Sequence, residues 1–320
     1  MNKKLSVILS FYNEEEVINE LCTRLQNTVN NLLTTNLIND YEIIFVNDCS
    51  TDKSLEIIKS FNKIKYKILT TSRKFGNPEC FLAGFRESDG DFIIYLDSDL
   101  QDPPELMKKM IEEYYKDTSY EIIHTKRTKR KSESLIKKFI SLIGYKYLTS
   151  SSKFNLPQNC GDYKLISRKA INEILKFNES DPFIKGIVGF VGYKQKFIEY
   201  ERQPRFNGNE KSKFKMNSLD LWFTHFDRTL VQFTDLPLKI IFLFGLTTSS
   251  VFLTYLVFIL FRLLYSSYYT VISIIILAFL ALTSLILISI GIMGLYIYQI
   301  HNQTRNRPVY IISHIDDNTK

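Results

Sequence analysis

The chain has 320 residues, a formal net charge of +7 and a mean hydropathy of −0.07, which suit one sizeable domain with an appendage. The sequence contains no G-x-G-x-x-G or P-loop motif, so neither a dinucleotide-binding fingerprint nor an ATPase is indicated. Its four cysteines and four histidines have no metal-ligand spacing, which argues against a zinc site.

Short apolar runs alternate with helical segments along the first 125 residues, as in a doubly wound, mostly parallel α/β sheet. The expected strands are Leu5–Phe11, Tyr41–Val46, Tyr66–Leu69, Phe92–Leu96 and Glu121–His124. The expected helices run from Glu14 towards Asn30, after Asp52 through Phe61, from Glu79 to Phe85 and from Glu105 to Tyr115. We expect Asn13 to cap the first of these helices.

Polar clusters follow the strands at the end where parallel sheets bind ligands. They are Tyr12–Glu14, Asn47–Asp52, Ser72–Asn77 and Asp97–Asp102. The last is the most informative, because three carboxylates and an amide precede a helix that Pro103 or Pro104 can start. Carboxylates pack poorly but bind hard cations that also coordinate diphosphate oxygens. We therefore expect a metal–nucleotide site here. The alternatives are capping roles, for Asp102 in this loop and for Asp48 after the second strand.

A basic run, Lys126–Lys138, follows the fifth strand and offers cations for a phosphate group. The alternative is a patch that faces solvent or lipid headgroups. Nucleic acid is not expected as a partner, because no aromatic residues interleave with the basic ones. Two amphipathic segments, Ser134–Thr149 and Leu219–Phe233, are candidates for helices that lie in a membrane interface.

Two long uncharged stretches lie near the C-terminus, Ile240–Phe261 and Leu263–Ile300. A membrane helix needs about 20 such residues, so we expect a hairpin of two spans at about 240–261 and 271–298. Basic residues flank the pair on its outer side, which places both ends of the chain in the cytoplasm. The expected organisation is a domain over 1–214, a juxtamembrane segment over 215–238, spans within 239–300 and a tail over 301–320.

An ordered set of motifs covers residues 5–214. The set comprises Tyr12-Asn13-Glu14, Val46 to Asp52, Ser72 to Gly76, Asp97 to Pro104, Gly161 to Leu165, Phe183 to Gly186, Gly192 to Gln195, Arg205-x-x-Gly208 and Ser212-Lys213-Phe214. It resembles family-2 inverting glycosyltransferases with the nucleotide-sugar-binding fold GT-A, and more narrowly the polyprenyl-phosphate glycosyltransferases. The chain departs from this pattern at Cys49, where the family usually has glycine, and in the longer spacing between Gly208 and Ser212.

The resemblance implies roles for individual residues. Those expected to contact the nucleotide are Tyr12, Glu14, Asp48 and Asp97. The expected ligands of Mg²⁺ or Mn²⁺ are Asp99, Gln101 and Asp97, and the expected catalytic residues are Asp162 and Asp99. An alternative role for Asp162 is a structural contact to a backbone turn. The cations and hydroxyl expected to hold the acceptor phosphate are Arg127, Arg130, Lys131, Arg205, Ser212 and Lys213.

The resulting expectation is a multi-pass protein of the inner membrane that transfers one hexose, with inversion, on its cytoplasmic face. The donor is a nucleotide diphosphate sugar, UDP-glucose on family frequency, and the acceptor is undecaprenyl phosphate or a related polyprenyl phosphate. Two alternatives remain open: a processive polysaccharide synthase, although Trp222 lies in no Gln-x-x-Arg-Trp element, and a catalytically silent lipid-binding scaffold. Self-association is also left open.

Overall fold

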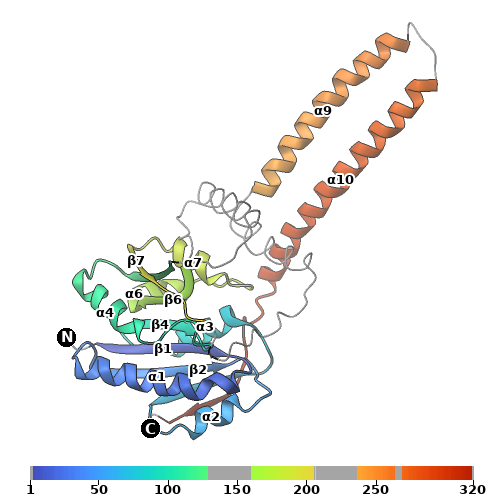
Figure 1. Ribbon diagram of the computed structural model, residues 1–320. Helices are drawn as coiled ribbons and strands as arrows, with labels where there is room; N and C mark the ends of the chain where they lie inside the picture. The colour runs from blue at the N-terminus through green and yellow to red at the C-terminus, as the bar shows by residue number, and fades with distance from the viewer. Residues whose placement is uncertain (1–2, 129–159, 205, 207–235, 264–268, 319–320) are drawn as a thin grey trace. The chain divides into compact units, whose positions relative to one another are not determined.

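The computed structural model describes residues 3–128, 160–204, 206, 236–263 and 269–318 (Figure 1). The chain divides into two compact units. One is an α/β head that includes the C-terminal residues Pro308–Lys320, and the other is a helical unit within Met216–Arg307. The expected interface helices Ser134–Thr149 and Leu219–Phe233 lie outside the described residues.

The head is built on one eight-stranded sheet of order β7-β5-β6-β4-β1-β2-β3-β8. The strands are β1 (Lys4–Phe11), β2 (Asp40–Asn47), β3 (Tyr66–Thr71), β4 (Phe92–Asp97), β5 (Ile122–Arg127), β6 (Cys160–Ser167), β7 (Gln195–Tyr200) and β8 (Ile312–Asp317). Strands β1 to β4 are mutually parallel, as are β5 and β7, whereas β6 and β8 run antiparallel to their neighbours. The five expected strands correspond to β1–β5, which confirms the α/β class and the mostly parallel sheet.

Helices cover both faces of this sheet. The described helices of the head are α1 (Glu15–Thr34), α2 (Ser54–Ser60), α3 (Asn77–Glu87), α4 (Leu106–Lys116), α6 (Arg168–Ile174) and α7 (Ile184–Phe190). Successive side chains of β1 point to opposite faces, so Val7 packs with α1, α2 and α4, whereas Ile8 packs with α3, α6 and α7. The two buried apolar layers hold the strand ends, and the loops that leave them, in fixed positions.

One predicted helix cap is wrong, and one predicted helix begins one residue later than expected. The N-cap of α1 is Glu14, and the Asn13 side chain instead accepts a hydrogen bond from the backbone N–H of Thr51 (2.8 Å), in the loop after β2. Helix α4 begins at Leu106, after both prolines, with Glu105 as its N-cap. At α1 a contact between neighbouring loops replaces local capping, and these loops belong to the candidate site.

Strand β8 joins the head from the far end of the sequence and pairs with β3. The Asn318 side chain accepts a hydrogen bond from the backbone N–H of Tyr66 (2.6 Å) and donates one to the carbonyl of Ile64 (3.1 Å). Lys59 of α2 forms an ion pair with Asp316 (2.8 Å). Sequence analysis assigned no strand to this tail. The head therefore contains chain from both sides of the helical unit.

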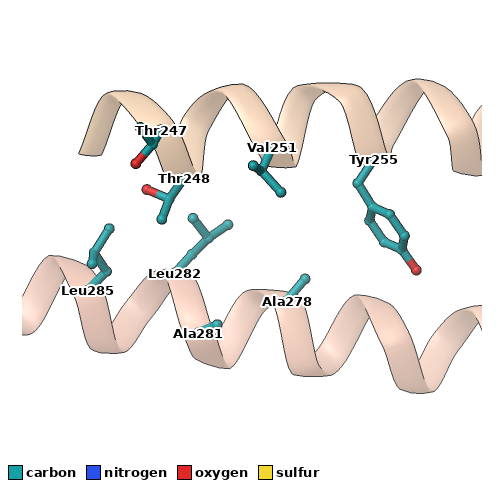
Figure 2. Close-up of a pocket in the computed structure, with 8 residues that line it drawn as sticks. All are labelled: Thr247, Thr248, Val251, Tyr255, Ala278, Ala281, Leu282 and Leu285. Atoms are coloured by element: carbon teal, nitrogen blue, oxygen red, sulfur yellow. The ribbon is translucent and has the colours of Figure 1, made fainter. Parts of the chain in front are cut away.

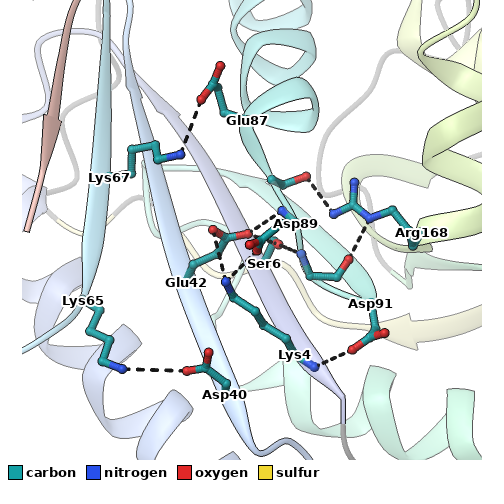
Figure 3. Close-up of polar contacts among 12 residues, drawn as sticks. Lys4, Ser6, Asp40, Glu42, Lys65, Lys67, Glu87, Asp89, Asp91 and Arg168 are labelled. Carbon is teal, nitrogen blue, oxygen red and sulfur yellow. Dashed lines mark hydrogen bonds and ion pairs between the residues drawn. The ribbon is translucent and has the colours of Figure 1, made fainter. Parts of the chain in front are cut away.

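The amino ends of the strands carry a network of ion pairs and hydrogen bonds, shown in Figure 3. Buried Glu42 accepts hydrogen bonds from Ser6 Oγ (2.5 Å) and from the backbone N–H of Asp89 (2.8 Å). Lys4 lies 2.6 Å from Asp89 and 3.7 Å from Glu42. Charges at this end of the sheet thus neutralise one another, and the network fastens the loop before β4 to β1 and β2.

The helical unit consists of α9 (Leu236–Leu263) and α10 (Tyr269–Thr304). Within the described residues, one segment, Ala281–Thr304, is long and apolar enough to cross a membrane, and a shorter apolar stretch, Ile241–Tyr255, lies in α9. A cavity of about 300 Å³ separates the two helices (Figure 2). It is lined by Thr247, Thr248, Val251, Tyr255, Ala278, Ala281, Leu282 and Leu285. One candidate span is therefore present, and the two-span hairpin stays a prediction.

The close approach of α3 to β1 at Gly84 gives a stability test. A Cβ added at Gly84 of α3 would overlap Cγ2 of Ile8 on β1. We expect Gly84→Ala to lower the free energy of unfolding by about 1–3 kcal/mol through overpacking. Ile8→Ala alone should cost about 2–5 kcal/mol because it leaves a cavity. In urea denaturation, the double variant should lose less free energy of unfolding than the two single variants lose together. Strictly additive losses would contradict the predicted clash.

Candidate active site

Three loops at the carboxyl ends of β1, β2 and β4 contain a residue with left-handed backbone. These are Asn13 (φ 53°), Cys49 (φ 60°) and Leu100 (φ 57°). Positive φ is uncommon outside glycine and concentrates at functional sites. The value at Cys49 also explains why glycine is usual there in the family that the sequence resembles. The backbone therefore makes tight turns at the edge of the sheet where ligands are expected.

Asp48 organises the loop after β3. Its carboxylate is buried and accepts hydrogen bonds from the backbone N–H groups of Phe75 (2.7 Å) and Gly76 (3.0 Å). The alternative role for Asp48, capping the next helix, is wrong, because the N-cap of α2 is Lys53. A nucleotide contact for Asp48 stays a prediction. In the structure, its hydrogen bonds join the loop after β2 to the loop after β3.

The other expected nucleotide contacts lie around the loop after β1. The ammonium of Lys74 stands 3.6 Å from the ring centroid of Tyr12, so a cation–π contact links this loop to the loop after β3. The backbone N–H of Glu14 donates a hydrogen bond to Ser54 Oγ (2.8 Å). The structure thus brings Tyr12, Glu14 and Asp48 to one edge of the sheet, on the adjoining loops after β1 and β2.

The acid loop, residues Asp97–Asp102, carries the expected metal ligands. Asn77 donates a hydrogen bond to Asp97 Oδ1 (2.9 Å), and Asp99 accepts one from the backbone N–H of Gln101 (3.1 Å). Burial, followed by the charges of Asp162, Asp99 and Asp102, raises the pKa of Asp97 to about 7, while the charge of Arg202 opposes this rise. We call these four aspartates the acid cluster.

The acid cluster fits a divalent cation by its chemistry, because it offers hard oxygen donors whose mutual repulsion a cation would relieve. It is not a preformed ligand set: within the described part of the chain, no three His, Cys, Asp or Glu side chains are grouped as a metal site. A cation would therefore have to draw the carboxylates of Asp97 and Asp99 together, with the nucleotide supplying further oxygens. The metal assignment stays a prediction.

Strand β6 brings Asp162 to the acid cluster from a distant part of the sequence. It lies antiparallel between β4 and β5, and sequence analysis did not predict it. Asp162 forms an ion pair with Lys185 (3.3 Å). Two residues further along, the buried ammonium of Lys164 donates a hydrogen bond to Tyr95 (3.1 Å), and burial lowers the pKa of Lys164 to about 8. Positive charge thus lies both beside and beneath Asp162.

Of the six residues expected to hold the acceptor phosphate, the structure describes Arg127 alone. The others lie outside the described residues: Arg130, Lys131, Arg205, Ser212 and Lys213. The Nε–H of Arg127 donates a hydrogen bond to Tyr200 (3.3 Å), and its Nη2 lies 3.7 Å from Asp102. Sequence analysis missed Tyr200 and Arg202, which reach the site only because β7 pairs with β5.

Comparisons with known proteins find similar sequences over almost the whole chain. The family model described as Glycosyl transferase family 2 matches residues 6–175. Glycosyltransferase YkcC of Bacillus subtilis is 34% identical over 96% of this chain and 92% of its own length. A prophage bactoprenol glucosyl transferase homologue of Escherichia coli K12 is 30% identical over 98% of this chain and 99% of its own length.

A solved mannosyltransferase from Pyrobaculum calidifontis, in complex with GDP-Man and Mn²⁺, is similar over 96% of this chain and 87% of its own length, with 13% identity and a TM-score of 0.45.

A buried histidine on β5, His124, gives a test of how stability depends on pH. His124 is buried, its Nε2 lies 2.9 Å from Gln195 Oε1, and burial, followed by the charge of Lys164, lowers its pKa to about 3. The unfolded chain binds this proton near pH 6.5, so stability from His124 is present above pH 6.5 and is lost as the pH falls towards 3. We expect His124→Gln to reduce the slope of unfolding free energy in this window by up to about 1.4 kcal/mol per pH unit.

Urea denaturation between pH 3.5 and 7 measures that slope. The matched control is His314→Gln, which removes an exposed imidazole from β8. An unchanged slope in the His124 variant, or an equal change in both variants, would contradict the assignment of a neutral, buried imidazole.

Proposed function

The chain belongs to glycosyl transferase family 2, and from this we propose that it transfers a glucosyl group from a nucleotide diphosphate sugar to a polyprenyl phosphate. Relatives named bactoprenol glucosyl transferase, which match almost the whole chain, support this acceptor and this sugar. The observation that carries the proposal is the acid cluster at the carboxyl ends of the strands, where Asp97 and Asp162 approach from β4 and β6.

The donor half of the reaction requires stabilisation of a departing diphosphate. Asp99, Gln101 and Asp97 would hold Mg²⁺ or Mn²⁺, which when bound supplies charge neutralisation for that leaving group. Burial and the neighbouring carboxylates, which raise the pKa of Asp97, support a cation at this position, since a bound cation favours the ionised carboxylate. Tyr12, Glu14 and Asp48 would contact the base and ribose. The proposed donor is UDP-glucose.

The acceptor half of the reaction requires positioning more than proton transfer, because a phosphate oxygen is already anionic near neutral pH. In an inverting transfer this oxygen attacks the anomeric carbon from the side opposite the diphosphate, and the bond to the diphosphate oxygen breaks. Arg127 would hold the acceptor phosphate through its guanidinium group. Asp162, which is ion-paired with Lys185, would orient the acceptor or accept a proton if the phosphate arrives protonated.

The proposal extends to the membrane. Ala281–Thr304 and the apolar part of α9 support an anchor of two spans, with both chain ends in the cytoplasm and the reaction at the inner face of the membrane. Large apolar side chains along both helices, among them Phe242, Leu253, Phe279 and Leu287, are exposed and suit contact with lipid.

Transfer is tested with membranes that contain the protein, undecaprenyl phosphate and UDP-glucose carrying a labelled sugar. We expect label in an organic-extractable, acid-labile lipid, and loss of transfer when EDTA removes divalent cations. Asp99→Ala should reduce the rate by about 100-fold or more, because it removes charge stabilisation from the leaving group. Label that appears only in long polymer, or transfer that continues unchanged in EDTA, would contradict the proposal.

The matched control is Asp117→Ala, which removes an exposed carboxylate at the end of α4, outside the acid cluster. It should keep the rate of the wild type within about twofold, since surface ion pairs contribute little to stability. A similar loss of rate in both variants would attribute the effect of Asp99→Ala to general destabilisation.

A further inference from the structure

Asp102, the last residue of the acid loop, is enclosed by partners from other elements. Its side chain is 1% exposed. It accepts a hydrogen bond from the hydroxyl of Tyr200, its Oδ2 lies 3.7 Å from Arg127 Nη2, and its Oδ1 lies 3.6 Å from Arg202 Nε. The expected capping role for Asp102 is wrong, because Glu105 is the N-cap of α4 and no side chain caps that helix.

The backbone holds each partner of Asp102 in place. Arg127 and Tyr200 are register neighbours on the parallel strands β5 and β7. The segment after β7 is fastened to the acid loop, because the backbone N–H of Gln203 donates a hydrogen bond to the carbonyl of Gln101 (3.0 Å). Gly161 of β6 leaves room for Arg127, since a Cβ there would lie 2.8 Å from Nη2. Strands β5, β6 and β7 thus converge with the acid loop on one carboxylate.

The two arginines keep capacity for a further anionic partner. Their side chains are 25% and 29% exposed, whereas Asp102 is enclosed. Arg202 Nε is buried without a hydrogen-bond partner among the described residues. The charge of Arg202 acts on Asp97, and the charge of Asp162 acts on Arg127, so both guanidinium groups lie at the acid cluster. A purely structural ion pair would not need two partly exposed cations beside the acid cluster.

We propose that Asp102 is a positioning residue that holds the guanidinium groups of Arg127 and Arg202 together as a preformed cradle for the phosphate of the acceptor. The inference rests on the proposed function and names the residue that assembles its acceptor subsite. Two guanidinium groups repel each other, and a shared carboxylate between them removes that repulsion before the ligand arrives. Arginine side chains that are already held in place lose less conformational freedom when the acceptor binds, so the acceptor binds more tightly.

The test measures binding and transfer separately. Undecaprenyl phosphate binding is measured by titration calorimetry with the full chain in detergent and without donor, and UDP binding is measured on the same sample. We expect Asp102→Asn to weaken acceptor binding by about tenfold, to raise KM for the acceptor equally, and to change kcat and the Kd for UDP less than threefold. A residue that only supported the fold would affect all four quantities.

Two further variants sharpen the result. Tyr200→Phe removes one hydroxyl and keeps both ion pairs, so we expect about threefold weaker acceptor binding; it also provides the test if Asp102→Asn does not fold. The matched control is Glu199→Gln, which breaks an exposed ion pair with Lys126 (3.0 Å) on the same two strands and should leave acceptor binding unchanged.

The outcomes separate the inference from the proposed function. Acceptor binding of wild-type strength in both Asp102→Asn and Tyr200→Phe overturns the inference, whether or not the protein transfers sugar. If both variants bind the acceptor more weakly but the wild type transfers no sugar, the inference about Asp102 is upheld and the proposed function is overturned. A wild-type chain that binds no polyprenyl phosphate overturns both.

Discussion

Repulsion among four carboxylates at the carboxyl ends of the strands is the constraint on which the site depends. Asp97, Asp99 and Asp102 come from one short loop, and Asp162 joins them from β6. Burial, followed by the charges of the other three aspartates, raises the pKa of Asp97 to about 7. Cations gather around these acids: Arg127 and Arg202 at Asp102, and Lys185 at Asp162. The arrangement concentrates negative charge where a metal ion would be bound and positive charge where phosphate groups would be bound.

Acidic side chains have different surroundings at the two ends of the sheet. At the amino ends, buried Glu42 accepts hydrogen bonds from Ser6 and from a backbone N–H group, and the exposed Asp89 forms an ion pair with Lys4 (Figure 3). At the carboxyl ends, the charges of Asp162, Asp99 and Asp102 act on Asp97, and the charge of Arg202 opposes them. A parallel sheet directs its binding loops to this second end, and this chain places its acid cluster there.

The elements that sequence patterns predicted are those whose signals are local. Strands β1–β5 and the helices between them follow from alternating apolar runs, and the acid loop follows from its position after β4. Strands β6, β7 and β8 were not predicted, because their pairing joins segments far apart in the chain; β8 follows α10 and pairs with β3. Asn13 was assigned to a cap from local rules, but an N–H of a neighbouring loop binds it instead. Lys164 and Tyr200 gain their roles only from strand pairing.

Calorimetric titration of Mn²⁺ into the protein with saturating UDP tests the central claim most directly, that the acid cluster binds a cation together with the diphosphate. The account predicts one saturable Mn²⁺ site per chain that is lost in Asp97→Asn and in Asp99→Asn while both variants remain folded. Mn²⁺ binding of wild-type affinity and stoichiometry in both variants would contradict it.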